Sequence, residues 1–301
     1  MKGEDGMIRS IGSTRCAWKT TLRFCSALLY STLLAVSSHA LGDTTAETDG
    51  QGGETQPQAT AVQETTTPEP TPEQKVKKLI SQYDKLYDTK RSDAKVARHM
   101  LEILKEAERI APAPSYDLAW RMAQIHWWLA EGSSDSNRAI QLAKTGWDYG
   151  KKAIRLNPKG VEGHMWLATS IGQYSLGVGV VKALMNGLEG KFLEPLDKAI
   201  QIDPAYACAS PLRTKGSYYK NLPWPKQDLD QAEAFLKKSL KLAPCGLRSH
   251  YYLAEVYEKK GDKAAAIAEL DKIINFSGGK ADRGDLPRIR GWAKKMKARL
   301  Q

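Results

Sequence analysis

The chain has 301 residues, of which 42% are hydrophobic, and its formal net charge is +11 at pH 7. This length and composition suffice for one large folded domain or two small ones. The positive charge favours acidic partners, anionic lipid or acidic polysaccharide, and it excludes a preference for basic partners.

Residues 1–40 are predicted to be an export signal. Basic residues precede an apolar run over residues 24–36, and residues 38–40 (Ser-His-Ala) form a small-x-small cleavage site. A cleaved signal would place the mature chain in the periplasm or cell envelope. The alternative is a retained N-terminal anchor, although the apolar run is short for a bilayer. The sequence leaves open whether translation starts at Met1 or at Met7.

Residues 41–74 are predicted to be a disordered linker. The segment is rich in Thr, Gln, Gly and Pro, carries acidic residues, and contains no Lys or Arg. The chain from Lys75 onward is therefore more basic than the whole-chain charge suggests. We expect an acidic protein partner, and no nucleic acid because the chain is expected to be exported. The alternative is that the lysines only form a solvated helix surface.

A six-residue pattern, small-x-x-[Ile/Leu]-x-Pro, recurs at residues 107–112, 153–158, 199–204 and 239–244. The small residue and the aliphatic residue three positions later share one helical face, and proline cannot continue a helix. Each copy is therefore predicted to end an amphipathic helix. Repetition at this period predicts an all-α solenoid of helical hairpins over residues 75–279.

The other helix of each unit carries the tetratricopeptide pattern. Residues 253–257 (Leu-Ala-x-x-Tyr) are followed by residues 266–270 (Ala-x3-Leu), and residues 167–171 (Leu-Ala-x-x-Ile) match the same pattern in an earlier unit. We predict a tetratricopeptide-type α-solenoid of about five hairpins. Gly146 and Gly150 stand where a small and a bulky residue are expected, so the second helix of that unit is the least regular.

The units exceed the standard repeat length, which predicts insertions. Residues 178–188 carry apolar residues at helical spacing and are expected to form an extra amphipathic helix. This helix is expected to fold into the lumen of the solenoid or to cover its end, with Lys182 near an apolar lining. The basic residues 280–301 are predicted to form a C-terminal capping segment.

An aromatic cluster provides the candidate binding residues. Trp120, Trp127 and Trp128 lie on one predicted first helix, and Trp166 and Tyr174 lie on the next. First helices of such repeats line the concave wall, where aromatic residues with polar tips anchor peptides and ligands. The alternative is that they fill the wide gap between enlarged repeats. At least one of the first three is expected to face outward or into a groove, because they cannot share one helical stripe.

Other chemistry receives little support from the sequence. Cys208 and Cys245 precede the first helices of consecutive repeats and are candidates for a disulfide, with two buried thiols as the alternative. The histidines of the mature chain have no partner at i+4, so no metal site is predicted. No nucleophile or phosphate-loop motif stands in a suitable context. The chain is therefore predicted to be a non-enzyme without a cofactor.

Three motifs carry a family resemblance. They are residues 118–123 (Leu-Ala-Trp-Arg-Met-Ala), the inserted residues 179–184 (Gly-Val-x-Lys-Ala-Leu) and residues 211–225, which begin Pro-Leu-Arg and end Leu-Pro-Trp-Pro.

Over residues 116–276 the chain resembles the tetratricopeptide family that includes the T-component of TRAP transporters, and it is similar to regulator-of-microtubule-dynamics proteins. The resemblance implies an exported, non-enzymatic helical protein that binds a partner, or a small hydrophobic ligand in a central channel. Arg213 and Tyr218 lie within the matching motifs and are included among the candidate binding residues.

Two functions follow from these observations. The first is an exported, non-enzymatic interaction scaffold whose concave groove holds an acidic protein partner. The alternative is a ligand-binding accessory subunit, like the T-component, that passes a small hydrophobic or acidic solute to a TRAP-type transporter. A homo-oligomer is compatible with both.

Overall fold

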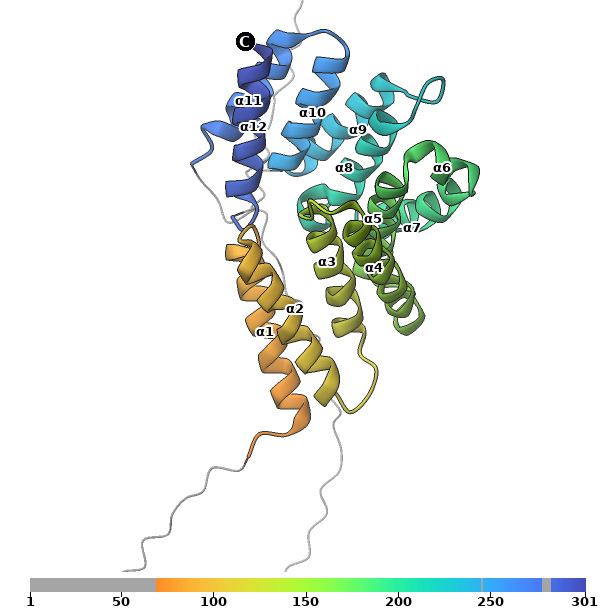
Figure 1. Cartoon of the computed structure of the whole chain (residues 1–301), viewed down its shortest axis with the longest axis vertical. Helices are drawn as coiled ribbons and strands as arrows, with labels where there is room; N and C mark the ends of the chain where they lie inside the picture. The colour runs from red at the N-terminus through yellow and green to blue at the C-terminus, as the bar shows by residue number, and fades with distance from the viewer. Residues whose placement is uncertain (1–68, 245, 278–282) are drawn as a thin grey trace, which may run out of the picture. The chain divides into compact units, whose positions relative to one another are not determined.

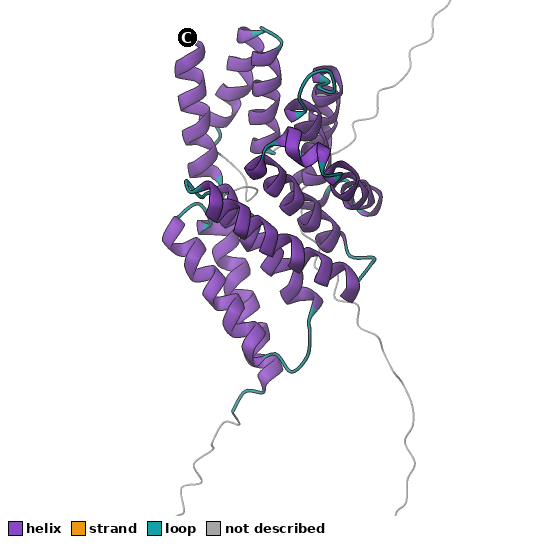
Figure 2. Ribbon diagram, turned by 45° about the vertical axis from the view of Figure 1, so that its right-hand side comes forward, coloured by secondary structure: helices purple, strands orange, loops and turns teal. Residues whose placement is uncertain are grey.

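The computed structural model describes residues 69–244, 246–277 and 283–301, and those from Pro70 onward belong to one compact unit. In these ranges the chain forms α-helices and no strands, which confirms the all-α class (Figures 1 and 2). None of the helices in these ranges is long and apolar enough to cross a membrane. The predicted signal segment, residues 1–40, lies outside the described residues.

Twelve helices span the described part of the chain. They are α1 (Pro72–Lys90), α2 (Ala94–Ile110), α3 (Tyr116–Glu131), α4 (Ser136–Leu156), α5 (Val161–Val178), α6 (Val180–Met185), α7 (Leu188–Ile202), α8 (Tyr206–Asn221), α9 (Leu229–Leu242), α10 (Leu247–Lys259), α11 (Lys263–Ile274) and α12 (Leu286–Leu300).

The helices pair as hairpins in chain order. Helix α1 packs on α2, α3 on α4, α8 on α9, and α10 on α11, while α5 pairs with α7 across the short inserted α6. Successive hairpins stack through α2 on α3, α4 on α5, α7 on α8, and α9 on α10 (Figure 1). First helices also contact one another, α3 with α5, α5 with α8, and α8 with α10. The predicted solenoid of about five hairpins with an insertion is confirmed.

The four proline patterns end the second helices of four hairpins, α2, α4, α7 and α9. In each, the residue before the proline is the C-cap, and its N–H donates to the carbonyl oxygen of the small residue four positions earlier. The bonds are 2.9 to 3.1 Å long. The four small residues are completely buried: Ala107, Ala153, Ala199 and Ser239. They are small because neighbouring helices pack directly against these positions.

Helix α1 begins earlier than the predicted end of the linker at residue 74. Pro72 is its first residue, and Thr71 and Gln74 form a reciprocal capping box in which each side chain accepts the backbone N–H of the other. A proline at the first helical position and a capping box together favour a helix start at this point. The rest of the predicted linker, up to residue 68, lies outside the described residues.

Two glycines let α4 lie directly on α5. The helix runs unbroken despite Gly146 and Gly150. A Cβ atom on Gly150 would lie 2.7 Å from the Cα of Leu167, and one on Gly146 would lie 2.7 Å from the Oγ of Ser170. The two glycines are therefore explained by the close approach of α5, and α4 is a continuous helix.

The insertion forms α6, but not in the place expected for it. The helix has six residues and packs against α5 and α7. Ala183 is buried, whereas Val181 and Met185 are exposed. In Figure 1 the helix lies at the outer edge of the unit rather than inside it. Two of its larger apolar side chains, Val181 and Met185, are thus left facing solvent.

The predicted capping segment, residues 280–301, contains α12. This helix packs on α11 and α10 and buries Ile289, Ala293 and Met296 against them. It covers the end of the last hairpin as a cap does. Residues 278–282, which connect α11 to it, lie outside the described residues.

The close approach of α4 and α5 gives the first prediction. Gly150→Ala should lower the free energy of unfolding by about 2 kcal/mol, because the new methyl group meets the backbone of α5. Urea unfolding measured by circular dichroism gives the change.

The matched control is Gly190→Ala on α7, where an added Cβ meets no atom within 4 Å. This variant should be more stable than the parent by up to about 1 kcal/mol, because alanine favours the helix. Equal stability of the two variants would contradict the predicted packing of α4 on α5.

Candidate functional site

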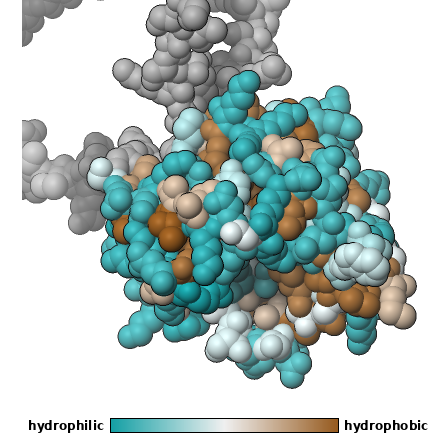
Figure 3. All heavy atoms as spheres, turned by 90° about the horizontal axis from the view of Figure 1, so that it is seen from above, coloured by the Kyte–Doolittle hydropathy of each residue, from teal (hydrophilic) through white to brown (hydrophobic). Residues whose placement is uncertain are grey.

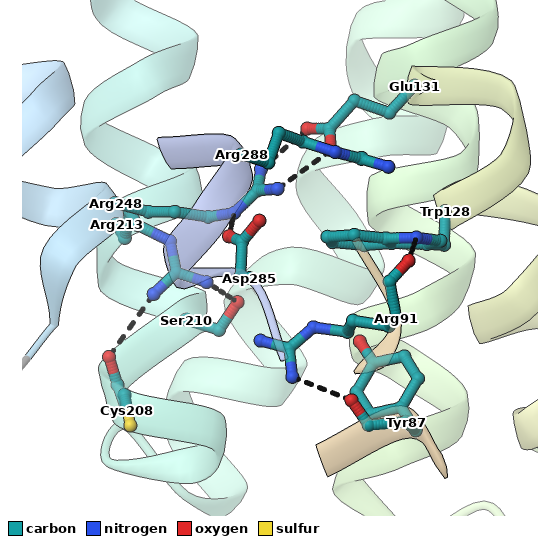
Figure 4. A network of polar contacts seen from close by, with 10 residues as sticks. All are labelled: Tyr87, Arg91, Trp128, Glu131, Cys208, Ser210, Arg213, Arg248, Asp285 and Arg288. Carbon is teal, nitrogen blue, oxygen red and sulfur yellow. Dashed lines mark hydrogen bonds and ion pairs between the residues drawn. The ribbon is translucent and has the colours of Figure 1, made fainter. Parts of the chain in front are cut away.

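Ten residues from the ends of α1 and α3, from α8 and α10, and from the start of α12 gather in one place, and we call them the inner-wall cluster (Figure 4). They are Tyr87, Arg91, Trp128, Glu131, Cys208, Ser210, Arg213, Arg248, Asp285 and Arg288. The set contains four arginines and two carboxylates. Positive charge is therefore in excess.

Arg248 lies at the centre of the cluster and is buried. Its Nη1 and Nη2 donate to the two carboxylate oxygens of Glu131, at 2.6 and 2.8 Å, and its Nε donates to Asp285. Burial lowers the pKa of the Arg248 guanidinium, but the two carboxylates outweigh burial and raise it. The side chain thus stays charged and holds two acids from distant parts of the chain.

Indole rings surround this guanidinium. Its central carbon lies 5.5, 5.2 and 5.5 Å from the ring centroids of Trp127, Trp128 and Trp292. Arg288 lies over Trp128 as well, at 3.9 Å, and its Nη1 donates to Glu131 at 3.1 Å. Aromatic faces attract cations and keep water away, so the ion pairs are strengthened by their surroundings.

Asp285 is completely buried. Burial raises the pKa of its carboxyl group. The charge of Arg248 and the hydrogen bond that Arg248 donates lower this pKa, and so do the charges of Arg91 and Arg288. Together they outweigh burial and hold the pKa below its usual value. Asp285 is therefore ionised in the folded protein. The carboxylate needs these arginines to remain buried.

The cluster joins the beginning of the solenoid to its end. The N–H of Ser92 donates to the carbonyl oxygen of Gly284 at 2.9 Å, and the indole Nε1 of Trp128 donates to the carbonyl oxygen of Arg91 at 2.6 Å. A Cβ atom on Gly284 would lie 2.3 Å from the carbonyl oxygen of Tyr87, so only glycine fits there. The last helix is thus attached to the first hairpin as well as to its neighbours.

Arg213 differs from the other arginines of the cluster. Its Nη2 donates to the Ser210 hydroxyl at 2.6 Å and its Nη1 to the Cys208 carbonyl oxygen at 3.3 Å. Both acceptors that the structure gives for this side chain, among the described residues, are uncharged. The Arg213 side chain is half-buried. Burial raises the pKa of the Tyr252 hydroxyl group, and the positive charges of Arg248 and Arg213 lower it in part. Among the described residues, Arg213 therefore forms no ion pair with a carboxylate.

The structure brings three of the predicted aromatic residues together. The ring centroid of Trp127 lies 5.9 Å from that of Trp128 and 5.5 Å from that of Trp166. Trp120, Trp128 and Trp166 are buried, and only 1% of Trp128 is exposed. Trp127 is the partly exposed tryptophan of its helix. The three buried tryptophans fill the inside of the fold, as in the alternative that the sequence analysis gave, whereas Trp127 is partly open to solvent.

The other predicted residues lie elsewhere. Tyr174 packs edge-on against Trp147 in the core between α4 and α5, with ring centroids 5.7 Å apart. The Tyr218 hydroxyl donates to Glu189 at 2.6 Å. Lys182 is exposed on α6. Of the candidate binding residues, only Trp128 and Arg213 belong to the inner-wall cluster.

The predicted disulfide stays a prediction. Cys208 is buried at the start of α8, where Ala207, Cys208 and Ala209 adopt left-handed backbone angles. Cys245 lies outside the described residues.

Sequence reasoning missed Arg248, Glu131, Asp285 and Arg288. The partners of Glu131 lie 117 and 157 residues away in the chain, so no local spacing reveals the pairs. The available signal was an arginine on the first helix of a repeat, placed four residues before Tyr252 on the same face. Such a position predicts the inner wall, but it does not predict the partner.

A small pocket lies between α2 and the start of α3. Its volume is about 260 Å³, and Glu108 and Lys152 are among the residues that line it. These two side chains bind each other at 2.8 Å, and the Tyr149 hydroxyl donates to the same carboxylate. The charged groups of Glu108 and Lys152 in this pocket are therefore already paired with each other. In the described ranges, His, Cys, Asp and Glu form no group that would hold a metal ion.

Comparison with known proteins identifies relatives of the chain. The family model described as Regulator of microtubule dynamics protein 1-3 matches residues 79–288. Regulator of microtubule dynamics protein 1 of Caenorhabditis elegans is 27% identical over 172 residues, which cover 52% of this chain and 75% of that protein.

A solved structure supports the fold. The crystal structure of a thermophilic TPR protein of Thermus thermophilus matches with a TM-score of 0.54 at 20% identity, over 73% of this chain and 97% of that one. The likeness confirms the tetratricopeptide-type fold. Of the two resemblances drawn from the sequence, these findings support the one to the regulator-of-microtubule-dynamics proteins.

The buried carboxylate gives the second prediction. At pH 7, Asp285→Asn should lower the free energy of unfolding by about 3 kcal/mol, because the substitution removes one partner of a buried ion pair. The carboxyl pKa is depressed in the folded state, so its contribution is present above the unfolded-state pKa of about 4 and is lost as the pH falls below it. The difference between parent and variant should therefore shrink as the pH falls below about 4, as measured by urea unfolding.

The control is Glu106→Gln, which removes an exposed carboxylate paired with Arg109 on the same helix. Exposed ion pairs are screened by solvent and contribute little to stability, so this variant should stay close to the parent at every pH. A pH-independent deficit in Asp285→Asn would refute the assignment of an ionised Asp285.

Proposed function

Because the chain belongs to the family of Regulator of microtubule dynamics proteins 1-3, we propose that it acts by binding a protein partner and catalyses no reaction. The tetratricopeptide-type fold supports this proposal, since stacked helical hairpins present extended surfaces to partners. The part of the partner that binds is an acidic segment, and it binds at Arg213.

The observation that carries the proposal is the distribution of charge in the inner-wall cluster. Arg248 and Arg288 share the carboxylate of Glu131, and Arg248 also holds Asp285. The charges of these four side chains are thus paired with one another. Arg213 contacts uncharged oxygens only, among the residues described, and a guanidinium in that setting gains most from a carboxylate.

Tyr252 provides a second contact for the same carboxylate. It lies on α10, and the charge of Arg213 acts on it. Burial raises the pKa of its hydroxyl group, so the group stays protonated at neutral pH and can donate a hydrogen bond. Arg213 and Tyr252 are both half-buried, which leaves them within reach of a partner.

If the N-terminal segment is retained as an anchor, microtubules are the partner to test, because the family description and the name of the nematode relative both refer to microtubule dynamics. A microtubule partner requires that the folded unit faces the cytosol. The retained N-terminal anchor allows this, whereas a cleaved export signal directs the unit to a different acidic partner.

Removal of the Arg213 charge provides the third prediction. Arg213→Gln should weaken binding of a fluorescein-labelled polyglutamate peptide at least about tenfold, because a charge-assisted hydrogen bond contributes about 1.5 to 3 kcal/mol. Arg213→Lys should recover part of the loss, since it keeps the charge but not the fork of donors. Fluorescence anisotropy measures the affinity.

The matched control is Arg138→Gln, which removes one positive charge from an exposed position on α4. Its affinity for the peptide should change less than about twofold, as expected for a screened surface charge. Equal losses in the two variants would refute a specific site. Co-sedimentation with polymerised microtubules, repeated at higher salt, then tests the named partner with the same variants.

Export remains a separate proposal, supported by the basic and apolar pattern of residues 1–40. The fourth prediction is that chain purified from its own cells begins directly after Ala40. Mass spectrometry of the intact N-terminus checks it. A chain that begins at Met1 or Met7 would instead support the retained anchor.

A further inference from the structure

Two exposed apolar tips stand out on the surface. Around α6, Leu176 is 52% exposed, Val181 58% and Met185 83%, and in the loop between α8 and α9 Trp224 is 89% exposed. Most other large apolar side chains of the described helices are buried or half-buried. Exposure this high means that the side chains project from the surface.

The two tips lie side by side. Glu189, at the start of α7, accepts a hydrogen bond from the Tyr218 hydroxyl at 2.6 Å and from Lys226 at 2.7 Å. Lys226 follows Trp224 by two residues, and Glu189 follows Met185 by four. In Figure 1 this loop and α6 lie on the same side of the unit, with the loop above the helix. We call the two segments together, residues 176–187 and 221–227, the apolar tip.

The backbone allows the tip to project. Gly179 and Gly187 flank α6 with φ angles of +94° and +66°, which glycine adopts readily. An added Cβ on either residue would meet nothing within 4 Å, so no neighbouring helix of the described chain covers these corners. In Figure 3 apolar side chains gather at the right-hand edge of the surface, the side on which α6 lies in Figure 1.

The charge of the apolar tip has one sign. Neither of its segments contains Asp or Glu, and Lys182 is exposed between Val181 and Met185. The nearby carboxylate of Glu189 is neutralised by Lys226. Exposed apolar side chains and an exposed cation thus occupy the same surface.

From these features we propose that the apolar tip inserts shallowly into the surface of an anionic membrane. Tryptophan favours the interface between lipid and water, where its ring is half-buried and its N–H stays hydrated. Lysine beside it is attracted to anionic headgroups. Leu176, Val181 and Met185 supply the apolar area that enters the acyl boundary.

A membrane accounts for this surface better than a protein partner. The two segments carry exposed apolar side chains and an exposed lysine but no acid, which matches the acyl boundary and the anionic headgroups of such a membrane. A fluid surface accepts projecting side chains without a matching shape. Docking of this kind does not depend on the partner binding at Arg213, which lies in the inner-wall cluster.

The test uses the full chain and vesicles of phosphatidylcholine that contain about one third phosphatidylserine. Hydrogen–deuterium exchange should show that residues 176–187 and 221–227 gain protection when these vesicles are added. Because exchange is measured segment by segment, contacts made by residues 1–40 do not enter the result.

The matched variants test the same surface by affinity. Met185→Ser with Trp224→Ser should weaken vesicle binding at least about tenfold, measured by co-flotation, because most of the inserted apolar area is lost. The control pair, Leu156→Ser with Leu242→Ser, removes two exposed apolar side chains from α4 and α9 and should change binding less than about twofold. Lys182→Gln should weaken binding to anionic vesicles about fivefold and leave binding to pure phosphatidylcholine unchanged.

Three results would overturn the proposal. They are no gain of protection in either segment, equal losses in the two double variants, and protection that rises with protein concentration in the absence of vesicles. The last result would assign the tip to a second copy of the chain. The Met185→Ser and Trp224→Ser variant should keep its affinity for polyglutamate, so failure of this proposal is distinguishable from failure of the site at Arg213.

Discussion

The buried guanidinium of Arg248 is the interaction on which the arrangement of the described helices depends. A charge removed from water costs several kcal/mol unless it is fully paired. Arg248, on the last hairpin, is paired with Glu131 at the end of α3 and with Asp285 at the start of α12. Three elements that are far apart in the chain must therefore keep fixed positions, since displacement of any one leaves a buried charge without its partner.

The ion pairs of Arg248 limit which side chains of the inner wall a partner can reach. A tetratricopeptide-type solenoid is expected to offer its concave wall to a partner, but the tryptophans on that wall are packed against arginine side chains of the same chain. What remains is a local excess of positive charge at Arg213. A second surface of different chemistry, the apolar tip, lies on α6 and the loop after α8. The molecule thus separates an electrostatic site from an apolar one.

Features that depend on neighbours in the chain could be predicted. The four proline patterns were assigned to helix ends because a helix terminus is a local event, determined by proline and by the hydrogen bond to the small residue before it. The number of hairpins follows from the same period. The position of α6 could not be predicted, because an amphipathic pattern shows which face is apolar but not whether another element covers it.

The sequence by itself therefore determined the fold class, the repeat boundaries and the residues that are small because helices cross there. It also singled out Trp128 and Arg213, which both lie in the inner-wall cluster. Only the tertiary structure decided that Trp128 is packed inside, that Arg248 links Glu131 to Asp285, and that Met185 and Trp224 are left exposed. The physical reason is distance along the chain. Pairing and burial between residues far apart in the sequence leave no periodic signal, because the neighbour that each side chain contacts is not part of the local sequence.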